Sequence, residues 1–423
     1  MRGDAGVNIL TTTLCYPTLA RPDQGIFIQR RAEALAQHPD VSLSVVSPQP
    51  WCPLLRCGEQ TIARNEPLPV TYPRLVSIPM IGWATDGVAY AGTLLRVLAR
   101  QRQAGLPPVD LIDAHFVYPD GVGAWLAGRR LGIPVVVTVR GKIVRLSRRA
   151  FRRMQIAAML RGVDARIAVS RSLAGWVHKV AGSDLNVDVV PNGIRPDVYR
   201  LVDRQWARIA LGWHQTARYV LAVGHLQRLK GFDRLLVVLP ALREALGDVR
   251  LVLVGSRRGE WWFARKVLRM IERCNHEAGC RCVEFLGFVD SERLNLLYNA
   301  ADVMVNSSRI EGWNNSISEA LAAGTPVVAT DVGGNPEQIS SDELGMIVRD
   351  GDLDALAGAL RSALVRPWNR ALIASSGGAR TWAQVAAEVH AVFERVLAAR
   401  AAPAGRQSPV GIDASAAMAE ATT

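Results

Sequence analysis

The sequence predicts an α/β protein with two doubly wound, Rossmann-like domains that face each other across a cleft. Short β-branched runs alternate with helical patterns along most of the 423 residues. The runs are apolar almost throughout, as in parallel strands that are buried on both faces. The alternation restarts once, after the turn at residues 191–193 and a polar stretch near residue 200. A chain of this length usually forms two or three domains, so we expect two sheets.

Strand candidates open each repeating unit. Six runs rich in Val, Ile and Leu lie in the first half, at residues 7–10, 41–46, 111–114, 135–139, 165–169 and 187–190. Five more lie in the second half, at residues 219–223, 250–254, 283–286, 302–306 and 326–329. Helical patterns such as 232–246 and 317–323 separate them, as in parallel, doubly wound sheets. Ligands of such sheets sit beyond the carboxyl ends of the strands, so we expect the chemistry in the cleft.

The restart divides the chain into a first domain at residues 1–200 and a second domain at residues 201–380. A helix is predicted at residues 381–400, because apolar residues from Trp382 to Val396 repeat at helical spacing. We expect this helix to return toward the first domain. Residues 401–423 are rich in Ala, Pro and Ser, which favours a disordered tail.

Positive charge is concentrated in one window of the chain. The sequence has 50 Lys and Arg against 38 Asp and Glu, a net charge of +12. Nine of the basic residues and a single acid, Asp164, lie between Arg140 and Arg166. A focused patch of this kind favours an anionic partner. Nucleic acid is disfavoured as that partner, since no basic motif interleaved with aromatic residues accompanies the patch.

A helix over residues 147–160 would present most of this patch on one face. With Arg140, we expect the face to consist of Arg148, Arg149, Arg152 and Arg153. It would suit anionic lipid head groups or a lipid-linked diphosphate. A solvated basic surface is the plainer alternative.

Cysteine content and hydropathy favour a cytoplasmic protein. Six scattered cysteines are too few for a disulfide framework. Cys274, Cys280 and Cys282 cluster near His276, but their spacing lacks the paired Cys-x-x-Cys of a zinc site. No apolar run reaches the ~20 residues that cross a bilayer, and the N-terminus resembles a first strand more than a signal peptide.

The most informative stretch covers residues 302–339, where a strand, a loop, a short helix beginning near Ser316 and a second strand follow one another. Free N–H groups at the helix N-terminus make a ready phosphate site, and Gly312 lets backbone approach a ligand. Glu311 and Glu319 bracket the loop, and carboxylates can accept hydrogen bonds from sugar hydroxyls. Two plainer alternatives stay open: Ser316 and Glu319 fit a capping box, and Glu311 fits a solvated loop acid.

This stretch resembles the retaining, family-four glycosyltransferases of the GT-B fold. Their signature is a Glu, seven residues and a second Glu, which Glu311 and Glu319 match within Glu-Gly-Trp-x-Asn and Glu-Ala-Leu-Ala-Ala-Gly-Thr-Pro. The resemblance extends from about residue 8 to 400. It implies that Glu311 contacts the hydroxyls of the transferred sugar and Glu319 the ribose of a nucleotide donor. Further donor contacts are expected at Gly312, Asn315 and Ser316, and Asn314 stands where the family usually has proline.

A cationic loop at residues 224–231 also resembles this family. Cations that precede a helix N-terminus oppose its macrodipole by ~0.3–1 kcal/mol each, and a bound diphosphate would reverse the sign of this effect. The family has Gly-Arg-Leu-x-x-x-Lys-Gly here, and its Arg and Lys hold the donor diphosphate. Lys230 and Gly231 match, whereas His225 stands in the arginine position. His225 or Arg228 could replace that arginine, and two solvated surface cations are the plainer alternative.

The first domain carries three further matches. His115 lies at a strand end, where the family has an active-site histidine, so we expect it in the cleft near the reacting sugar; a structural histidine is the alternative. Gly25 matches a glycine loop that the family places against the donor phosphate and the acceptor, although a simple turn is also possible. Arg140-Gly141 resembles the family's strand that ends in His-Gly or Arg-Gly.

The resemblance implies an enzyme that moves a hexosyl unit from a UDP or GDP sugar to a saccharide or lipid-linked saccharide, with retention of configuration. The first domain would bind the acceptor and the second the donor. We expect His115, Lys230 and Glu311 to be catalytic, with no metal or cofactor, in polysaccharide synthesis on the inner face of the cell membrane. A sugar-nucleotide epimerase of the same fold and a non-catalytic sugar-nucleotide sensor remain alternatives.

Overall fold

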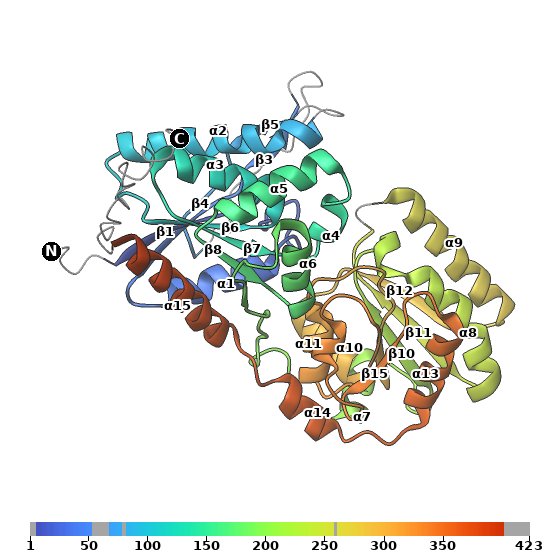
Figure 1. Cartoon of the computed structure of the whole chain (residues 1–423). Helices are drawn as coiled ribbons and strands as arrows, with labels where there is room; N and C mark the ends of the chain where they lie inside the picture. The colour runs from blue at the N-terminus through green and yellow to red at the C-terminus, as the bar shows by residue number, and fades with distance from the viewer. Residues whose placement is uncertain (1–5, 53–66, 78–81, 258–259, 402–423) are drawn as a thin grey trace, which may run out of the picture.

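Two parallel sheets organise the computed structural model, which describes residues 6–52, 67–77, 82–257 and 260–401. The first sheet has the strand order β4-β2-β1-β6-β7-β8-β9 and the second the order β12-β11-β10-β13-β14-β15. Every strand pair in both sheets is parallel. The predicted pair of doubly wound domains is therefore confirmed, and Figure 1 shows the sheets side by side, each flanked by helices.

The first sheet consists of short apolar strands. In chain order they are β1 (Val7–Thr12), β2 (Val41–Val46), β4 (Val70–Thr71), β6 (Leu111–His115), β7 (Val135–Val139), β8 (Ala165–Ala168) and β9 (Asp188–Val189). Around it lie α1 (Ile26–Ala36), α2 (Gly82–Gln103), η1 (Val117–Gly121), α3 (Val122–Leu131), α4 (Ile143–Leu146), α5 (Ala150–Gly162) and α6 (Arg171–Ala181). A separate two-stranded sheet pairs β3 (Gln49–Trp51) with β5 (Arg74–Val76). The central strands β6 and β7 are buried at every residue. The nearly continuous apolar run of β7 predicts this burial, whereas β6 also buries Asp113 and His115.

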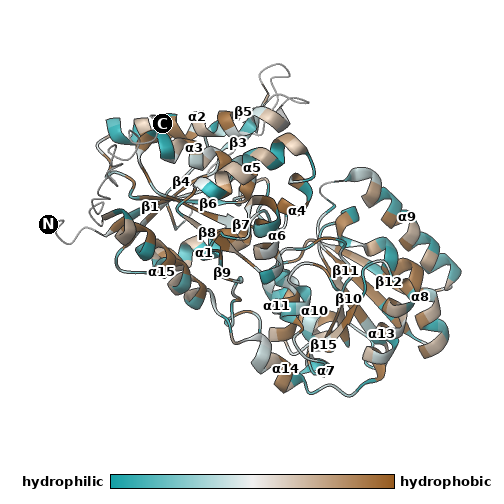
Figure 2. Ribbon diagram, in the orientation of Figure 1, coloured by the Kyte–Doolittle hydropathy of each residue, from teal (hydrophilic) through white to brown (hydrophobic). Residues whose placement is uncertain are grey.

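The second sheet repeats this construction. Its strands are β10 (Arg218–Val223), β11 (Val249–Val254), β12 (Val283–Gly287), β13 (Val303–Asn306), β14 (Val327–Thr330) and β15 (Gly345–Val348). Its helices are α7 (Arg204–Leu211), η2 (Arg228–Lys230), α8 (Phe232–Leu246), α9 (Trp261–Glu277), α10 (Ser291–Ala300), α11 (Asn315–Ala322), α12 (Asn335–Gln338), α13 (Leu353–Val365) and α14 (Arg370–Gly377). Figure 2 shows the apolar residues concentrated in the strands and on the helix faces that cover them.

The last helix, α15 (Trp382–Ala401), packs on the first domain as predicted. Val385, Val389 and Phe393 share a buried cluster with Ile28 and Leu35 of α1. In Figure 1 the red helix α15 lies beside α1, although it follows the second sheet in the chain. The chain thus crosses twice between the domains. The domain boundaries themselves stay predictions, and the predicted tail at 402–423 lies outside the described residues.

One predicted helix begins later than the sequence suggested. Helix α5 begins at Ala150, because Arg149 is extended, with φ −91° and ψ 123°. Arg148 and Arg149 therefore precede the helix, and the prediction that they share one helical face with Arg152 and Arg153 is wrong. The strands β3, β4, β5 and β15 were also not predicted, since each is a short edge or satellite strand with weak alternation.

Two absences concern the described part of the chain. No helix there combines the length and the apolar character needed to cross a membrane. No three Cys, His, Asp or Glu side chains gather there in a way that could hold a metal ion. Cys274 and Cys282 instead pack in the core of the second domain, and Cys280 is exposed.

Candidate active site

A pocket of about 370 Å³ lies between the two domains, beyond the carboxyl ends of the strands of the second sheet. The first domain contributes Asp23, Ile26, Phe27 and Arg30, from the loop before α1 and its first turns. The second domain contributes the larger share, which includes Gly224, His225, Lys230, Glu311, Asn314, Asn315, Ser316 and Glu319. The structure therefore brings the two predicted loops, 224–231 and 311–319, to one cavity.

Glu311 is fixed by three donors on a single carboxylate oxygen. Its Oε1 atom accepts from Lys230 Nζ at 2.6 Å, Ser308 Oγ at 2.7 Å and Asn314 Nδ2 at 3.0 Å. Among the described residues, none is hydrogen bonded to Oε2. The side chain is 10% exposed and lines the pocket. A solvated loop acid would not have three protein donors, so that alternative does not fit the geometry.

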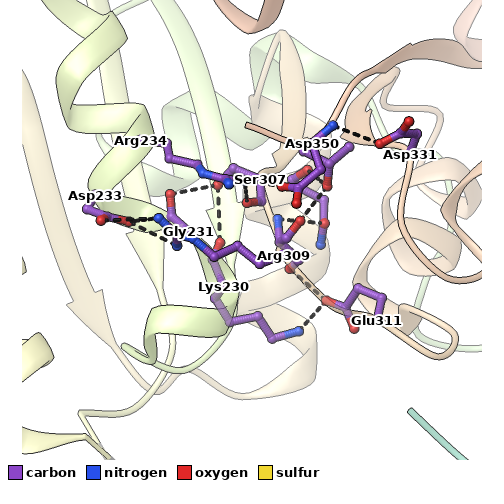
Figure 3. A network of polar contacts seen from close by, with 12 residues as sticks. Lys230, Gly231, Asp233, Arg234, Ser307, Arg309, Glu311, Asp331 and Asp350 are labelled. Atoms are coloured by element: carbon purple, nitrogen blue, oxygen red, sulfur yellow. Dashed lines mark hydrogen bonds and ion pairs between the residues drawn. The ribbon is translucent and has the colours of Figure 1, made fainter. Parts of the chain in front are cut away.

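The backbone that carries Lys230 is held just as closely (Figure 3). Ser307 Oγ lies 3.1 Å from the carbonyl oxygen of Lys230 and 3.0 Å from that of Gly231. Gly231 has φ 68°, and a Cβ atom there would lie 2.1 Å from the Ser307 carbonyl oxygen, so only glycine fits. Arg234 donates to the same carbonyl at 3.1 Å and pairs with Asp350 at 2.6 Å. The backbone of Lys230 is thus held against the segment after β13 that carries Glu311.

The structure distinguishes between His225 and Arg228, the two residues that could replace the family's arginine. His225 lines the pocket, with Nδ1 2.7 Å from Ser256 Oγ and 3.9 Å from an oxygen of Asp23. Arg228 is exposed and does not line the pocket. Its backbone N–H donates to Glu260, and its carbonyl accepts from Arg309. The predicted placement of Arg228 in the donor loop therefore does not bring its side chain to the cavity.

Glu319 is the second acid of the predicted pair, and its side chain is buried. Tyr298 donates to its Oε2 atom at 3.1 Å, and Arg30 from the first domain lies 3.8 Å from Oε1. Burial raises the pKa of Glu319 to about 7, against the opposing effect of Arg30. The capping-box alternative is wrong, because the N-cap of α11 is Asn314, whose side chain accepts from the N–H of Ser316.

Gly312 has a different neighbour from the one predicted. A Cβ atom on Gly312 would lie 2.7 Å from the backbone nitrogen of Gly141, and one on Gly141 would lie 2.9 Å from that of Gly312. The two glycines therefore let the backbones of the two domains touch. The contact between the domains gives Gly312 a structural role, and the expected contact with a ligand stays a prediction.

His115 does not face the cleft, contrary to the prediction. Its side chain is fully buried, and its ring nitrogens contact Arg31 Nη2 at 2.8 Å and Arg140 Nη2 at 3.2 Å. Burial and the charge of Arg31 lower the pKa of His115 to about 3, so the ring is neutral. Burial alone would raise the pKa of Asp113, but Arg31 and His115 hold it below its usual range. A catalytic role for His115 would thus be exerted through its neighbours.

Arg140 belongs to this buried cluster and not to the predicted basic surface. It is 5% exposed, its guanidinium carbon lies 4.5 Å from the ring centre of Phe27, and it donates to Asn192. The predicted patch is therefore smaller. Arg148, Arg149 and Arg153 are exposed, whereas Arg152 is half-buried with its guanidinium carbon 4.9 Å from the ring centre of Tyr118.

Gly25 is the N-cap residue of α1 and does not itself line the pocket. It has φ 72°, and a Cβ atom would lie 1.9 Å from the carbonyl oxygen of Cys15. The glycine is thus required by the turn, which is the plainer alternative, while the turn sets Ile26, Phe27 and Arg30 against the cavity.

Sequence reasoning missed several residues of the site. Among them are Arg30, which lines the pocket, and Ser308 and Tyr298, which donate to Glu311 and Glu319. Arg30 comes from a helix that is distant in sequence from the rest of the pocket, so no local pattern marks it. Ser308 could have been found, because it follows the end of a buried strand immediately before the loop of Glu311. Tyr298 lies inside α10, where an aromatic residue normally indicates core packing.

Comparison with known proteins decides the family. Residues 217–365 match the family described as "Glycosyl transferases group 1", and residues 26–198 match "Glycosyltransferase Family 4". The D-inositol 3-phosphate glycosyltransferase of Rhodococcus erythropolis is 31% identical over 306 residues, which cover 69% of this chain and 67% of that protein. The chain belongs to these glycosyltransferases. The glycosyltransferase is also 27% identical to the "Putative teichuronic acid biosynthesis glycosyltransferase TuaC" of Bacillus subtilis, over 78% of this chain and 82% of that one.

Solved structures share the GT-B fold of this glycosyltransferase. Sucrose-phosphate synthase from Thermosynechococcus elongatus superposes with a TM-score of 0.75 at 21% identity, over 93% of this chain and all of the other. HepE of Anabaena, solved in complex with UDP, superposes with a TM-score of 0.69 at 19% identity, over 92% of this chain. The predicted GT-B architecture is therefore confirmed.

Proposed function

We propose that this glycosyltransferase transfers a hexosyl unit from a UDP or GDP sugar to a saccharide or lipid-linked saccharide, with retention of the anomeric configuration. The observation that carries the proposal is the Glu311 carboxylate, whose Oε1 atom is occupied by three protein donors while Oε2 has none among the described residues. A carboxylate held in this way presents one oriented acceptor to a sugar hydroxyl in the pocket.

The pocket offers a matching place for each part of a sugar nucleotide. Lys230, His225 and Arg30 line it as cations or potential cations and would neutralise a diphosphate. Glu319 would accept from ribose hydroxyls. The aromatic and aliphatic side chains of Phe288, Val289 and Leu294 line the same cavity and would cover a nucleobase. The name of HepE's bound ligand, UDP, supports a uridine donor by analogy of fold alone.

The proposed reaction breaks the bond between the anomeric carbon and the diphosphate oxygen. The acceptor oxygen bonds to that carbon from the same face, and its proton passes to the departing diphosphate. The negative charge that grows on the diphosphate is stabilised by Lys230, which already carries a positive charge at the pocket wall. Since fixed side-chain cations supply this charge, we propose that transfer continues in excess EDTA.

The acceptor is proposed from the relatives. TuaC is named for teichuronic acid biosynthesis, which supports a polysaccharide acceptor, and seven other relatives are named for D-inositol 3-phosphate. Phe151 and Met154 are 44% and 59% exposed, and the nearby Arg149 and Arg153 are exposed as well. This combination supports contact with an anionic membrane surface that carries a lipid-linked acceptor. Flotation with anionic liposomes tests the contact, and equal binding to neutral liposomes would contradict it.

The activity is tested by incubating the purified protein with UDP and GDP sugars and an acceptor panel that includes saccharides and inositol 3-phosphate. We expect release of a nucleoside diphosphate that increases with one acceptor, and a product with the anomeric configuration of the donor. Acceptor-independent conversion of one sugar nucleotide into its epimer would favour the epimerase, and tight nucleotide binding without turnover would favour the sensor.

A further inference from the structure

Three hydrogen-bonded side chains link the buried cluster of the first domain to the donor pocket of the second. Arg140 Nη1 donates to Asn192 Oδ1 at 3.2 Å, and Asn192 Nδ2 donates to Asn315 Oδ1 at 2.9 Å. Arg140 follows the last residue of β7, Asn192 lies in the turn that follows β9, and Asn315 is the first residue of α11. Asn192 is 5% exposed and does not line the pocket, whereas Asn315 does.

The chemistry of Arg140 fixes the direction of these two hydrogen bonds. A guanidinium only donates, so the Asn192 atom that faces it must be the oxygen, and the Asn192 atom that faces Asn315 must be the amide nitrogen. The oxygen of Asn315 must then face Asn192. Burial and Arg31 lower the pKa of Arg140 to about 9, which leaves it charged at neutral pH. The direction does not depend on which ring nitrogen of His115 carries the proton.

The consequence appears at the pocket. The Asn315 oxygen is turned toward Asn192, and none of the described residues accepts from its Nδ2 group, which is therefore available to a ligand. We propose that Asn192 is a positioning residue that orients the Asn315 carboxamide so that its N–H donates to an oxygen of the sugar-nucleotide donor. This proposal rests on the proposed function, since it assigns that site a further contact.

The contact between the domains supports the positioning role. Backbones of Gly141, next to Arg140, and Gly312, next to Glu311, approach so closely that neither position has room for a side chain. Glu337 from the second domain accepts from the N–H groups of Arg171 and Ser172 at 2.9 Å and 3.0 Å, at the start of α6. These contacts join the two domains that carry Asn192 and Asn315.

Substitution of Asn192 can reverse the direction of its hydrogen bond with Asn315 without removing that bond. In Asn192→Asp, the carboxylate still accepts from Arg140, but it can only accept from Asn315. The Asn315 amide would then turn, with its nitrogen toward residue 192 and its oxygen toward the donor. A residue with a merely structural role would tolerate this isosteric change, because Arg140 keeps its partner.

Affinity for UDP and GDP, measured by calorimetry, and turnover of the preferred sugar nucleotide test the proposal. We expect Asn192→Ala to weaken nucleotide binding about fivefold, the effect of one hydrogen bond, and Asn192→Asp to weaken it more, at unchanged thermal stability. In the Asn315→Ala background, Asn192→Ala should have no further effect. Asn275→Ala is the matched control, because Asn275 makes two bonds to the backbone of Val283 outside the pocket.

The outcomes separate the two proposals. Wild-type affinity in Asn192→Asp, or additive losses in the double variant, would overturn the positioning role of Asn192. Nucleotide binding by the wild type without turnover of any sugar nucleotide would instead overturn the proposed transfer reaction, while the affinities of the Asn192 variants would still decide their own question.

Discussion

The ammonium of Lys230 lies 2.6 Å from Oε1 of Glu311, and both side chains line the same pocket between the domains. The pair holds the cation at the pocket wall before any donor is present. A diphosphate that binds there must share Lys230 with Glu311 or take it over. The pair thus joins the proposed phosphate contact to the proposed sugar contact.

Replacement of Lys230 should slow transfer more than it weakens donor binding. We expect Lys230→Ala to lower kcat by roughly 10²-fold, because the charge that grows on the leaving diphosphate loses its nearest cation. Steady-state kinetics with a saturating acceptor measures this effect. Lys266→Ala is the matched control, since Lys266 forms an ion pair with Asp233 at 3.4 Å and does not line the pocket. Equal losses in both variants would contradict the assignment.

Glu319 predicts a pH dependence of both stability and binding. Burial raises its pKa from the ordinary value of 4.5 to about 7 in the folded protein. The neutral acid therefore favours the folded state, and this contribution is present below pH 4.5 and lost as pH rises through 7. Glu319→Gln should have the same Tm as the wild type near pH 4.5 and a higher Tm at pH 8.

The affinity for a sugar nucleotide should instead rise with pH, because the ionised carboxylate of Glu319 is the better acceptor for ribose hydroxyls. From pH 8 to pH 6 we expect the wild type to lose roughly tenfold in affinity for a sugar nucleotide, and Glu319→Gln to lose much less. Calorimetry at a series of pH values measures this difference. Parallel pH profiles in the two proteins would contradict a ribose contact at Glu319.

His225 and Arg228 should differ in their effect on the donor. His225 lines the pocket and Arg228 is exposed outside it, so His225→Ala should raise the KM for the donor about tenfold, as expected for one charge-assisted hydrogen bond to phosphate. Arg228→Ala should leave the KM unchanged, and His225→Arg should retain binding. A larger loss in Arg228→Ala than in His225→Ala would show that the exposed arginine is the phosphate ligand.

Because the backbones of Gly141 and Gly312 touch, we expect one added methyl group at residue 141 to push the two loops apart. A Cβ atom in Gly141→Ala would lie 2.9 Å from the backbone nitrogen of Gly312, so one of the two loops must shift. Displacement of the loop of Glu311 by about 1 Å would lower kcat by roughly 10²-fold. Gly175→Ala in α6 is the control, because a Cβ atom there meets nothing within 4 Å. Similar kcat values for the two variants would refute the role of this contact.

The fold could be predicted because its strands are continuous apolar runs, and the two predicted pocket loops because each begins where such a run ends. The position of His115 could not be predicted from the sequence. Its strand end suggests the cleft, but Arg31 and Arg140 enclose the ring from other elements. Arg140 was misplaced for the same reason: its sequence neighbours are exposed cations, while it is itself buried against Phe27. Partners from distant segments decide burial, and sequence spacing does not reveal them.

The most direct test of the proposed donor site compares wild type and Glu311→Gln in two measurements: nucleotide affinity by calorimetry and acceptor-dependent release of the nucleoside diphosphate. The substitution keeps the size of the side chain and removes the charge that orients the sugar. We expect the affinity for UDP or GDP to stay within about threefold, since the sugar contact is absent in those ligands, and kcat to fall by roughly 10²–10³-fold. Wild-type turnover by Glu311→Gln would contradict the account.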